Sequence, residues 1–474
     1  MDNNLAALTV IFTEFYYWIT VVLMFLIHVG FCMYEVSVSR HKNHMHTLLK
    51  NSMLAPLVTV TFFFFGWWIY FALPNGPGIL GLFKDVESSG LIAAPFATPW
   101  SELMGTHLGG KPASAALTAA DTALWARLNG VFWAAFLLFS WTAASIISGA
   151  IIERVRSFAF WIIAVMIGSV TWVIDAAWGW HPNGWMVQVL GYHDAYASGV
   201  IHAIAGGTAL GVLVHLGPRI GRFDASGKAR AFPLQNHWLT VIGLFLIYTG
   251  FWGFYAACNV PIFDVDSSAE GVWFSATNIY LQPTTLSAIT FNFLMSLSGG
   301  MLAGYILSKG EGFWTFSAGL AGVIAGSAGN DLYHPLQALV VGALGATVAY
   351  KLHYWVENRF KIDDAVGAVA VHGYGGFFGV VIAGFLLWGY PASPLYDSVV
   401  TPWGQLIGAV IMFWVLGFLP AWVVAGLMKR WGVLRIPEAV ELAGLDRAEH
   451  LDAAIGEREL VKVEEQAARG AGLV

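Results

Sequence analysis

Long apolar runs separated by short polar segments divide this chain along most of its length. A helix that crosses a bilayer needs about 20 mostly apolar residues. Lipid offers no partners for backbone polar groups, so helices are the expected form of these runs. The pattern predicts an all-α membrane protein with about eleven transmembrane helices. The predicted spans are residues 9–35, 52–73, 130–152, 158–180, 197–217, 237–258, 284–308, 313–328, 335–354, 366–388 and 404–428.

The composition supports this prediction and excludes several other classes. Hydrophobic residues make up 57% of the 474 positions and charged residues 11%, less than half of the roughly 25% typical of soluble domains. A net charge of −6 argues against a nucleic-acid-binding surface. The two cysteines, Cys32 and Cys258, lie in apolar runs and form no recognisable disulfide framework or metal motif.

Basic residues distinguish the two sides of the membrane. With eleven spans, 20 of the 23 Lys and Arg residues fall on one side, and only Lys84, Lys111 and Arg127 fall on the other. The positive-inside rule makes the crowded side cytoplasmic, so we expect an outside N-terminus and a cytoplasmic C-terminus in a bacterial inner membrane. The first run has no basic residues before it, which favours a retained helix over a cleaved signal peptide.

Two histidines lie in matching sequence contexts. His202 and His372 each follow a small apolar segment and precede a Gly-Gly pair, in the fifth and tenth predicted spans. An odd number of helices per half gives the two halves opposite topology, so we expect two inverted five-helix repeats, about 9–217 and 237–388, plus a final helix. Inverted repeats place substrate sites near the midplane of the membrane. The neighbouring glycines would let the backbones approach closely.

Other roles for these histidines remain open at this point. A single histidine in a span, such as His28, is more often a packed residue bonded to a neighbour. Histidine is also a common heme ligand, but two hemes would need four histidines paired across helices, and that pattern is not evident. Ionisable residues inside a membrane are costly and are functional candidates by default.

Several motifs in order resemble the ammonium transporter (Amt/Mep/Rh) family. They are Gly-Ala-Ile-Ile-Glu-Arg from Gly149 to Arg154, Asp363-Asp364 followed by Val371-His372-Gly373, and the tail segment that starts at Leu434. The similarity covers most of residues 10–456. It implies transport of ammonium or a small methylated amine and no enzymatic activity or cofactor.

The resemblance assigns roles to individual residues. His202 and His372 match the paired histidines that line the pore, and Phe139 and Phe254 match the aromatic gate above them. Trp180 matches the aromatic wall of the outer recruitment site. Asp194, eight residues before His202, matches an acid that supports that site.

The sequence departs from the family pattern near the expected recruitment site. The segment after Phe254 has Tyr255 and Cys258 where the family has Asn and Ser, and a thiol is a weaker acceptor than a hydroxyl. The fourth span adds three residues around Trp180, namely Trp172, Asp175 and Trp178. Aromatic cages hold methylated ammonium groups, so these residues suggest a preference for a methylated amine such as trimethylamine. Alternatively, the tryptophans belong to the interfacial belt and the packing.

The first span also departs from the family, because Tyr34-Glu35 stands where a Tyr-Gly-Gly-like turn is usual.

The resemblance also implies partners and domain limits. We expect a transmembrane domain over residues 1–429 with its last span at about 404–428, and a cytoplasmic tail over 430–474. The family suggests a homotrimer surrounded by membrane lipid, with one pore per subunit and a PII-type regulator at the tail. Two alternatives remain: a transport-inactive amine sensor and, less favoured, a heme-binding membrane redox protein. The tail is too short for a kinase or cyclase domain.

Overall fold

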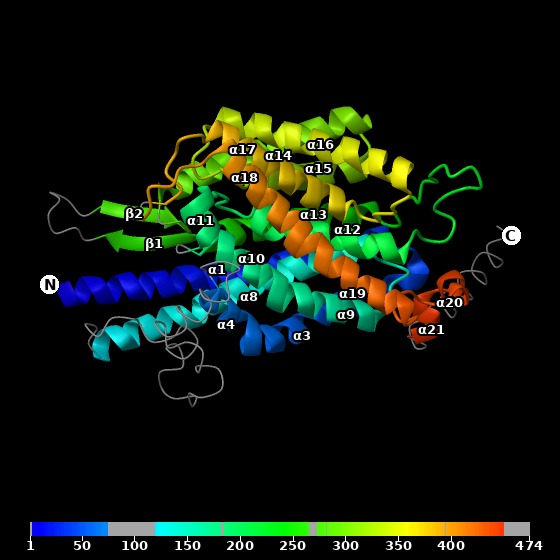
Figure 1. Ribbon diagram of the computed structural model, residues 1–474, viewed down its shortest axis with the longest axis horizontal. Helices are drawn as coiled ribbons and strands as arrows, with labels where there is room; N and C mark the ends of the chain where they lie inside the picture. Colours follow the sequence, from blue (N-terminus) through cyan, green and yellow to red (C-terminus); the bar gives the residue numbers. More distant parts are fainter. Residues whose placement is uncertain are drawn as a thin grey trace, which may run out of the picture.

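The computed structural model describes residues 2–73, 119–181, 184–264, 273–280, 282–393 and 395–449, and this part is a bundle of long helices (Figure 1). Ten of its helices are long and apolar enough to cross a membrane, and a shorter apolar helix, α15 (Gly312–Gly326), lies between two of them in sequence. Together they account for the eleven predicted spans. The ten long spans are Ile11–Val38, His41–Gly66, Val131–Ala150, Ser157–Gly179, Ser198–Leu216, His237–Ala257, Leu286–Ser308, Pro335–Phe360, Val369–Leu386 and Pro402–Arg430.

Several spans contain π-helical turns, in which the backbone hydrogen bonds skip one residue more than in an α-helix. The sequence analysis did not predict these turns, which often occur at functional sites. The spans without π-turns are α1 (Asp2–Val38), α8 (Ala119–Ala150), α13 (His237–Ala257), α14 (Leu286–Ser308), α15 and α16 (Pro335–Phe360). The second span begins with a short 3-10 helix, η1 (His41–Asn43), and continues through α2 (His44–Ser52) and α3 (Leu54–Thr61). It ends in the π-helical turn η2 (Phe62–Gly66), which is followed by α4 (Trp67–Ala72). Span 4 comprises α9 (Ser157–Met166), η3 (Ile167–Thr171) and α10 (Trp172–Gly179), and span 5 comprises η4 (Ser198–Ala203) and α12 (Ile204–Leu216). Span 10 comprises η5 (Val369–Tyr374) and α17 (Gly375–Leu386). The last span comprises α18 (Pro402–Val410), η6 (Ile411–Phe418) and α19 (Leu419–Arg430).

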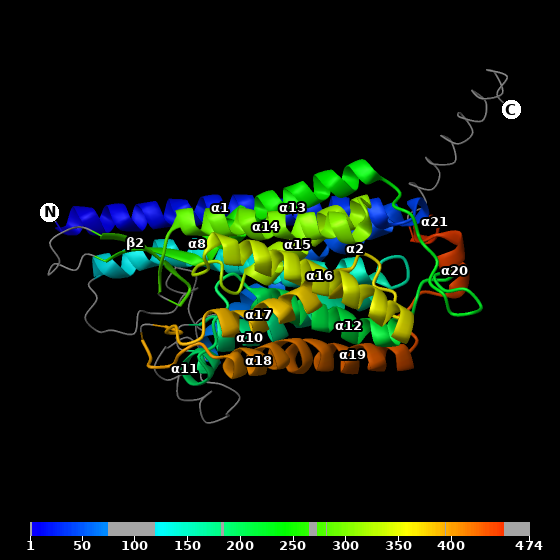
Figure 2. The same cartoon turned by 90° about the horizontal axis from the view of Figure 1, so that it is seen from above.

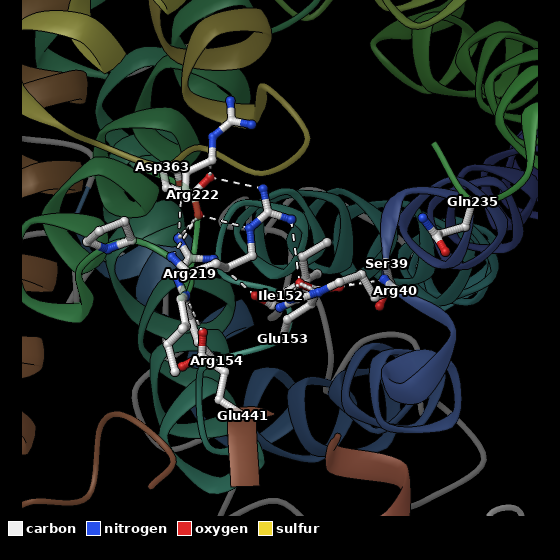
Figure 3. Close-up of polar contacts among 12 residues, drawn as sticks. Ser39, Arg40, Ile152, Glu153, Arg154, Arg219, Arg222, Gln235, Asp363 and Glu441 are labelled. Carbon is white, nitrogen blue, oxygen red and sulfur yellow. Dashed lines mark hydrogen bonds and ion pairs between the residues drawn. The ribbon is translucent and has the colours of Figure 1, made fainter. Parts of the chain in front are cut away.

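Ion pairs join the ends of several spans at one end of the bundle (Figure 3). Arg219, just after span 5, pairs through its Nε with the Asp363 Oδ2 at 2.8 Å, just before span 10. Arg219 also lies 3.6 Å from Glu153, after span 3, which pairs at 2.7 Å with Arg40, after span 1. The ends of spans 1, 3 and 5 and the start of span 10 therefore share one face, as the predicted alternation requires.

These carboxyl groups depend on their arginine partners. Burial alone would raise the pKa of Asp363, but Arg219 and Arg154 outweigh it and hold that pKa below its ordinary value. The Glu153 carboxyl is governed in the same way, because Arg219 and Arg40 lower its pKa against the effect of burial. Both groups are therefore charged in the folded protein at neutral pH.

The start of the C-terminal tail docks on the same face. Its short helices are α20 (Glu438–Ala443) and α21 (Leu445–Glu449). Arg435 donates to the carbonyl of Leu216 at 2.8 Å and pairs with Glu441 at 2.8 Å. Asp446 accepts hydrogen bonds from the backbone N–H groups of Met45 and His46 at 2.9 and 2.7 Å. The tail thus connects to the end of span 5 and to the start of span 2.

The opposite end carries a small antiparallel sheet that the sequence analysis did not predict. Its strands are β1 (Asn259–Asp264), β2 (Trp273–Asn278) and β3 (Pro283–Thr284), in the order β1-β2-β3. The short helix α11 (Trp185–Leu190) lies at this end as well (Figure 1). Apart from this sheet and a few isolated bridges, the described part is helical, turn or irregular.

Span 1 and span 6 lie side by side, and the last span crosses the bundle obliquely along one face (Figures 1 and 2). Spans 5 and 10 cross inside the bundle and run antiparallel. At the crossing, a Cβ on Gly206 would lie 2.1 Å from the Gly373 Cα, and one on Gly376 would lie 2.2 Å from the Ser198 carbonyl oxygen. This confirms that the glycines beside the two histidines allow close backbone contact, because any larger residue would force the helices apart.

Candidate functional site

The two histidines meet where spans 5 and 10 cross. The Nδ1 atoms of His202 and His372 lie 3.1 Å apart, and the rings are 5.1 Å apart at an angle of 29°. Both side chains are buried. For two neutral imidazoles, a hydrogen bond between the Nδ1 atoms requires one to donate and the other to accept, so the Nε2 atoms at the two ends have opposite protonation. The pair can therefore accept a proton at one end and release one at the other.

A line of aromatic rings leads from the histidine pair toward the end that carries the sheet. The Phe254 ring stacks on His202 at 5.8 Å, and the edge of Phe139 meets Phe254 at 4.8 Å and 84°. Trp180 follows, with its ring 5.0 Å from Phe139. All three aromatic side chains are fully buried. The structure thus brings together the five residues that the resemblance assigns to the recruitment wall, the gate and the pore.

Asp194 holds this arrangement in place from the start of span 5. Its Oδ2 accepts hydrogen bonds from the N–H groups of Gly199 and Val200 at 2.7 and 2.9 Å, and from the Tyr192 hydroxyl at 3.1 Å. Its backbone carbonyl accepts a hydrogen bond from the Trp180 indole at 2.7 Å. Burial raises the pKa of the Asp194 carboxyl, while the N–H donors lower it in part. Asp194 therefore orients both the π-helical turn of His202 and the Trp180 ring.

Asp364 plays the same part at the start of span 10, which the sequence analysis missed. Its carboxylate accepts hydrogen bonds from the N–H groups of Ala368, Val369 and Ala370 at 2.8, 2.9 and 3.2 Å. Burial raises its pKa to about 7 despite these donors. The signal was present in the sequence, because Asp364 precedes His372 by the same eight residues that separate Asp194 from His202.

Asp175 is fully buried on α10, and neither of its carboxyl oxygens has a hydrogen-bond partner within the described residues. Trp172, also fully buried on this helix, lies 6.2 Å from Phe136, whose ring contacts Phe139 at 5.7 Å and Trp180 at 6.3 Å. A buried carboxylate without a partner is costly, so this group is suited to a bound cation or to a proton of its own.

The other three candidate residues have contacts of their own. Trp178 is half-buried and packs on Trp185 of α11 at 5.7 Å. The Cys258 thiol lies 3.3 Å from the carbonyl of Phe254 in its own helix. Tyr255 stacks on Tyr196 at 4.2 Å, and its hydroxyl lies 2.7 Å from the Ser327 Oγ. The contacts described for these three side chains do not include Trp180.

Comparison with protein families gives the decisive match. The model of the Ammonium Transporter Family matches residues 15–455, nearly the whole chain. The chain belongs to the ammonium transporter family. Members of this family are transporters or channels, and this member is a multi-pass membrane protein.

Individual relatives cover the chain almost from end to end. Ammonium transporter Amt2 of Archaeoglobus fulgidus is 29% identical over 450 residues, which cover 90% of this chain and 85% of the relative. Ammonium transporter Amt2 of Methanocaldococcus jannaschii is 28% identical over 440 residues, with 90% and 88% coverage.

Solved structures share the same fold. A protein described as "Sensor Amt Protein" superposes with a TM-score of 0.72 at 23% identity, covering 95% of this chain and all of that one. Mep2 of Saccharomyces cerevisiae gives 0.64 at 15% identity, with 90% and 88% coverage. At these identities the likeness concerns the fold.

Proposed function

We propose that this ammonium transporter family member conducts ammonium, or a small methylated amine, through the pore marked by His202 and His372. The observation that carries the proposal is the 3.1 Å contact between two buried imidazoles behind the closed aromatic pair Phe139 and Phe254. A bare cation at the centre of a bilayer is strongly disfavoured. A pore lined by aromatic rings and paired imidazoles suits a neutral amine and a separately relayed proton.

The route begins at Trp180. A cation over an aromatic face gains a few tenths to about 2 kcal/mol, which is enough to concentrate it at the mouth of the pore. The cation gives its proton to the histidine pair, and the neutral amine passes between Phe139 and Phe254. The proton crosses from one imidazole to the other through their shared hydrogen bond, and the amine regains a proton on the far side. Charge and atoms are conserved across the whole cycle.

The substrate preference is a second part of the proposal. Asp175 has no hydrogen-bond partner in the described structure. Trp172, three residues before it on α10, lies 6.2 Å from Phe136, whose ring lies 6.3 Å from Trp180. A site that combines a carboxylate with aromatic rings favours a cation with an apolar methyl surface. We therefore propose that Trp172, Asp175 and Trp180 form the part of the recruitment site that favours methylated amines.

The assembly, sidedness and regulation follow the family. We propose a homotrimer with one pore per subunit, in a bacterial inner membrane with the basic face cytoplasmic. Large apolar side chains exposed on α13 and α14, such as Trp238, Phe291 and Ile306, suit contact with lipid or with a neighbouring subunit. The docked tail on the basic face is the proposed contact for a PII-type regulator.

Substrate-induced currents in proteoliposomes test the proposal. Ammonium, methylammonium and trimethylammonium are compared at equal concentration against empty vesicles. Currents for at least one amine are expected, and the largest for trimethylammonium if Asp175 belongs to the recruitment site. A current largest for ammonium would assign Asp175 and Trp172 to packing. Binding without any current would instead favour an amine sensor.

A further inference from the structure

A small cavity lies against His372, on the side of the histidine pair that faces the ion pairs of Figure 3. Its volume is about 10 Å³, which is close to the least that holds one water molecule. Its lining includes Phe31 and Glu35 of α1, Ser317 of α15, and His372. A carboxylate and the inner histidine of the pore thus face the same water-sized space.

Glu35 lies in span 1, one turn before its end at the basic face, and is fully buried. The Ser148 hydroxyl donates to its carboxylate, and the Asn51 amide donates to its Oε1 at 3.1 Å. A carboxylate has about four acceptor positions, and these two donors leave some of them free. Glu35 can therefore accept a further hydrogen bond from the cavity.

Lys50 provides the opposite charge close by. Its ammonium group donates to the backbone carbonyl of Ser148 at 2.8 Å and lies 5.1 Å from the centre of the Phe160 ring. Ser148 therefore connects Lys50 to Glu35, because its hydroxyl donates to the Glu35 carboxylate and its carbonyl accepts from the Lys50 ammonium group. The other titratable groups that face Glu35 are Cys32 and Tyr34 on its own helix and His372 across the cavity.

We propose that Glu35 is the inner proton acceptor of this pore, serving the transport proposed above. A residue that served only as the charge partner of Lys50 would not need to lie beside the pore. Glu35, however, lines the same cavity as His372. Tyr34-Glu35 also departs from the Tyr-Gly-Gly-like turn that the resemblance in sequence leads us to expect here. The Glu35 carboxylate gives the inner half of the pore a proton site beside His372.

The transfer is balanced as written. An N–H bond of the His372 imidazolium breaks, and its proton passes to a water molecule in the cavity. That water gives another of its protons to the Glu35 carboxylate, which becomes a neutral acid, while His372 becomes neutral. The acid then releases its proton to the solution at the basic face, where the neutral amine takes up a proton.

Four proteins in proteoliposomes test the inference: wild type, Glu35→Gln, Glu35→Asp, and the double variant Glu35→Gln/Lys50→Met. The double variant removes both charges, so that its folding does not depend on an unpaired lysine. Glu14→Gln, the same change near the other end of α1, is the matched control. Ammonium currents are recorded while the pH at the basic face is varied, and assembly is checked by size-exclusion chromatography.

We expect at least a tenfold lower current in Glu35→Gln and in the double variant, and loss of their response to pH at the basic face. Glu35→Asp should retain most of the current and that pH response, and Glu14→Gln should behave as wild type. A double variant with wild-type current and pH response would overturn the inference and leave Glu35 as a partner of Lys50. Absence of current in the wild type would overturn the proposed function and this inference together.

Discussion

Spans 5 and 10 place a histidine by the same construction and surround it differently. In each, an aspartate eight residues earlier accepts backbone N–H groups, and a π-helical turn then carries the histidine. His202 faces the stacked ring of Phe254, whereas His372 lines the water-sized cavity with Glu35. The shared construction explains why the two imidazoles meet. In the function proposed above, this difference would let the outer half select a cation by aromatic contact while the inner half handles a proton.

The largest effect is expected from removing an aspartate that accepts the backbone N–H groups at the start of span 5 or span 10. Asp194→Ala leaves two buried N–H groups without their acceptor, and the Tyr192 hydroxyl keeps only the Met412 sulfur at 3.0 Å. Each unsatisfied buried group costs about 1–3 kcal/mol. We expect a loss of several kcal/mol in stability and a sharp fall in the yield of folded protein, measured by size-exclusion chromatography and thermal unfolding.

Asp364→Ala should have a similar effect, because Asp364 accepts three N–H groups at the start of span 10. Asp224→Ala, in an exposed turn where Asp224 bonds Ser226 and Lys228, is the control and should change the melting temperature little. A stable Asp364→Ala protein beside an unstable Asp194→Ala protein would break the proposed equivalence of the two spans.

A smaller effect, on substrate recruitment, is expected from a change at the outer end of the pore alone. Asp175→Asn removes the ability of this buried side chain to carry a negative charge and changes its size little. We expect the half-saturating concentration of trimethylammonium to rise about fivefold, which corresponds to ~1 kcal/mol, with less than a twofold change for ammonium. Equal shifts for both substrates would contradict a specific role for Asp175 with methylated amines.

The smallest effect concerns the ion pairs at the basic face. Asp363 and Glu153 have lower pKa values in the folded protein than their ordinary values of about 3.9 and 4.3. Their stabilising contribution is therefore complete above about pH 4.5 and is lost as the pH falls through and below that range. We expect the melting temperature to fall by a few degrees between about pH 5 and pH 3.

Asp363→Asn provides the check on this pH dependence. The variant should start from a lower melting temperature and lose less of it on acidification, because one of the two titrating groups is gone. A variant that shows the full wild-type decrease would place the acid sensitivity elsewhere in the protein.

The sequence predicted the framework well because its signals are strong and local. Apolar runs of about 20 residues identify the spans. The predicted alternation of their direction across the membrane is supported by the Arg219–Asp363 contact, which joins the end of span 5 to the start of span 10. The matched contexts of His202 and His372 indicated that these residues belong together, and the structure brings their rings to 5.1 Å.

The features that sequence reasoning missed depend on tertiary contacts. The direction of a side chain around its helix decides that the Tyr255 hydroxyl reaches Ser327, and no pattern in one span gives that rotation. In the spans that contain π-helical turns, each turn shifts the side-chain directions further, because it adds a residue to the helical period. Glu35 appeared only as a departure from the family pattern until the cavity with His372 was seen.

The most direct test of the account is the ammonium current of His202→Ala and His372→Ala, each reconstituted as assembled protein and compared with wild type at several pH values. If the two imidazoles relay the proton, each variant should lose at least tenfold of the proton-coupled current or change its pH dependence, while assembly is retained. Wild-type currents with an unchanged pH profile in both variants would contradict the account.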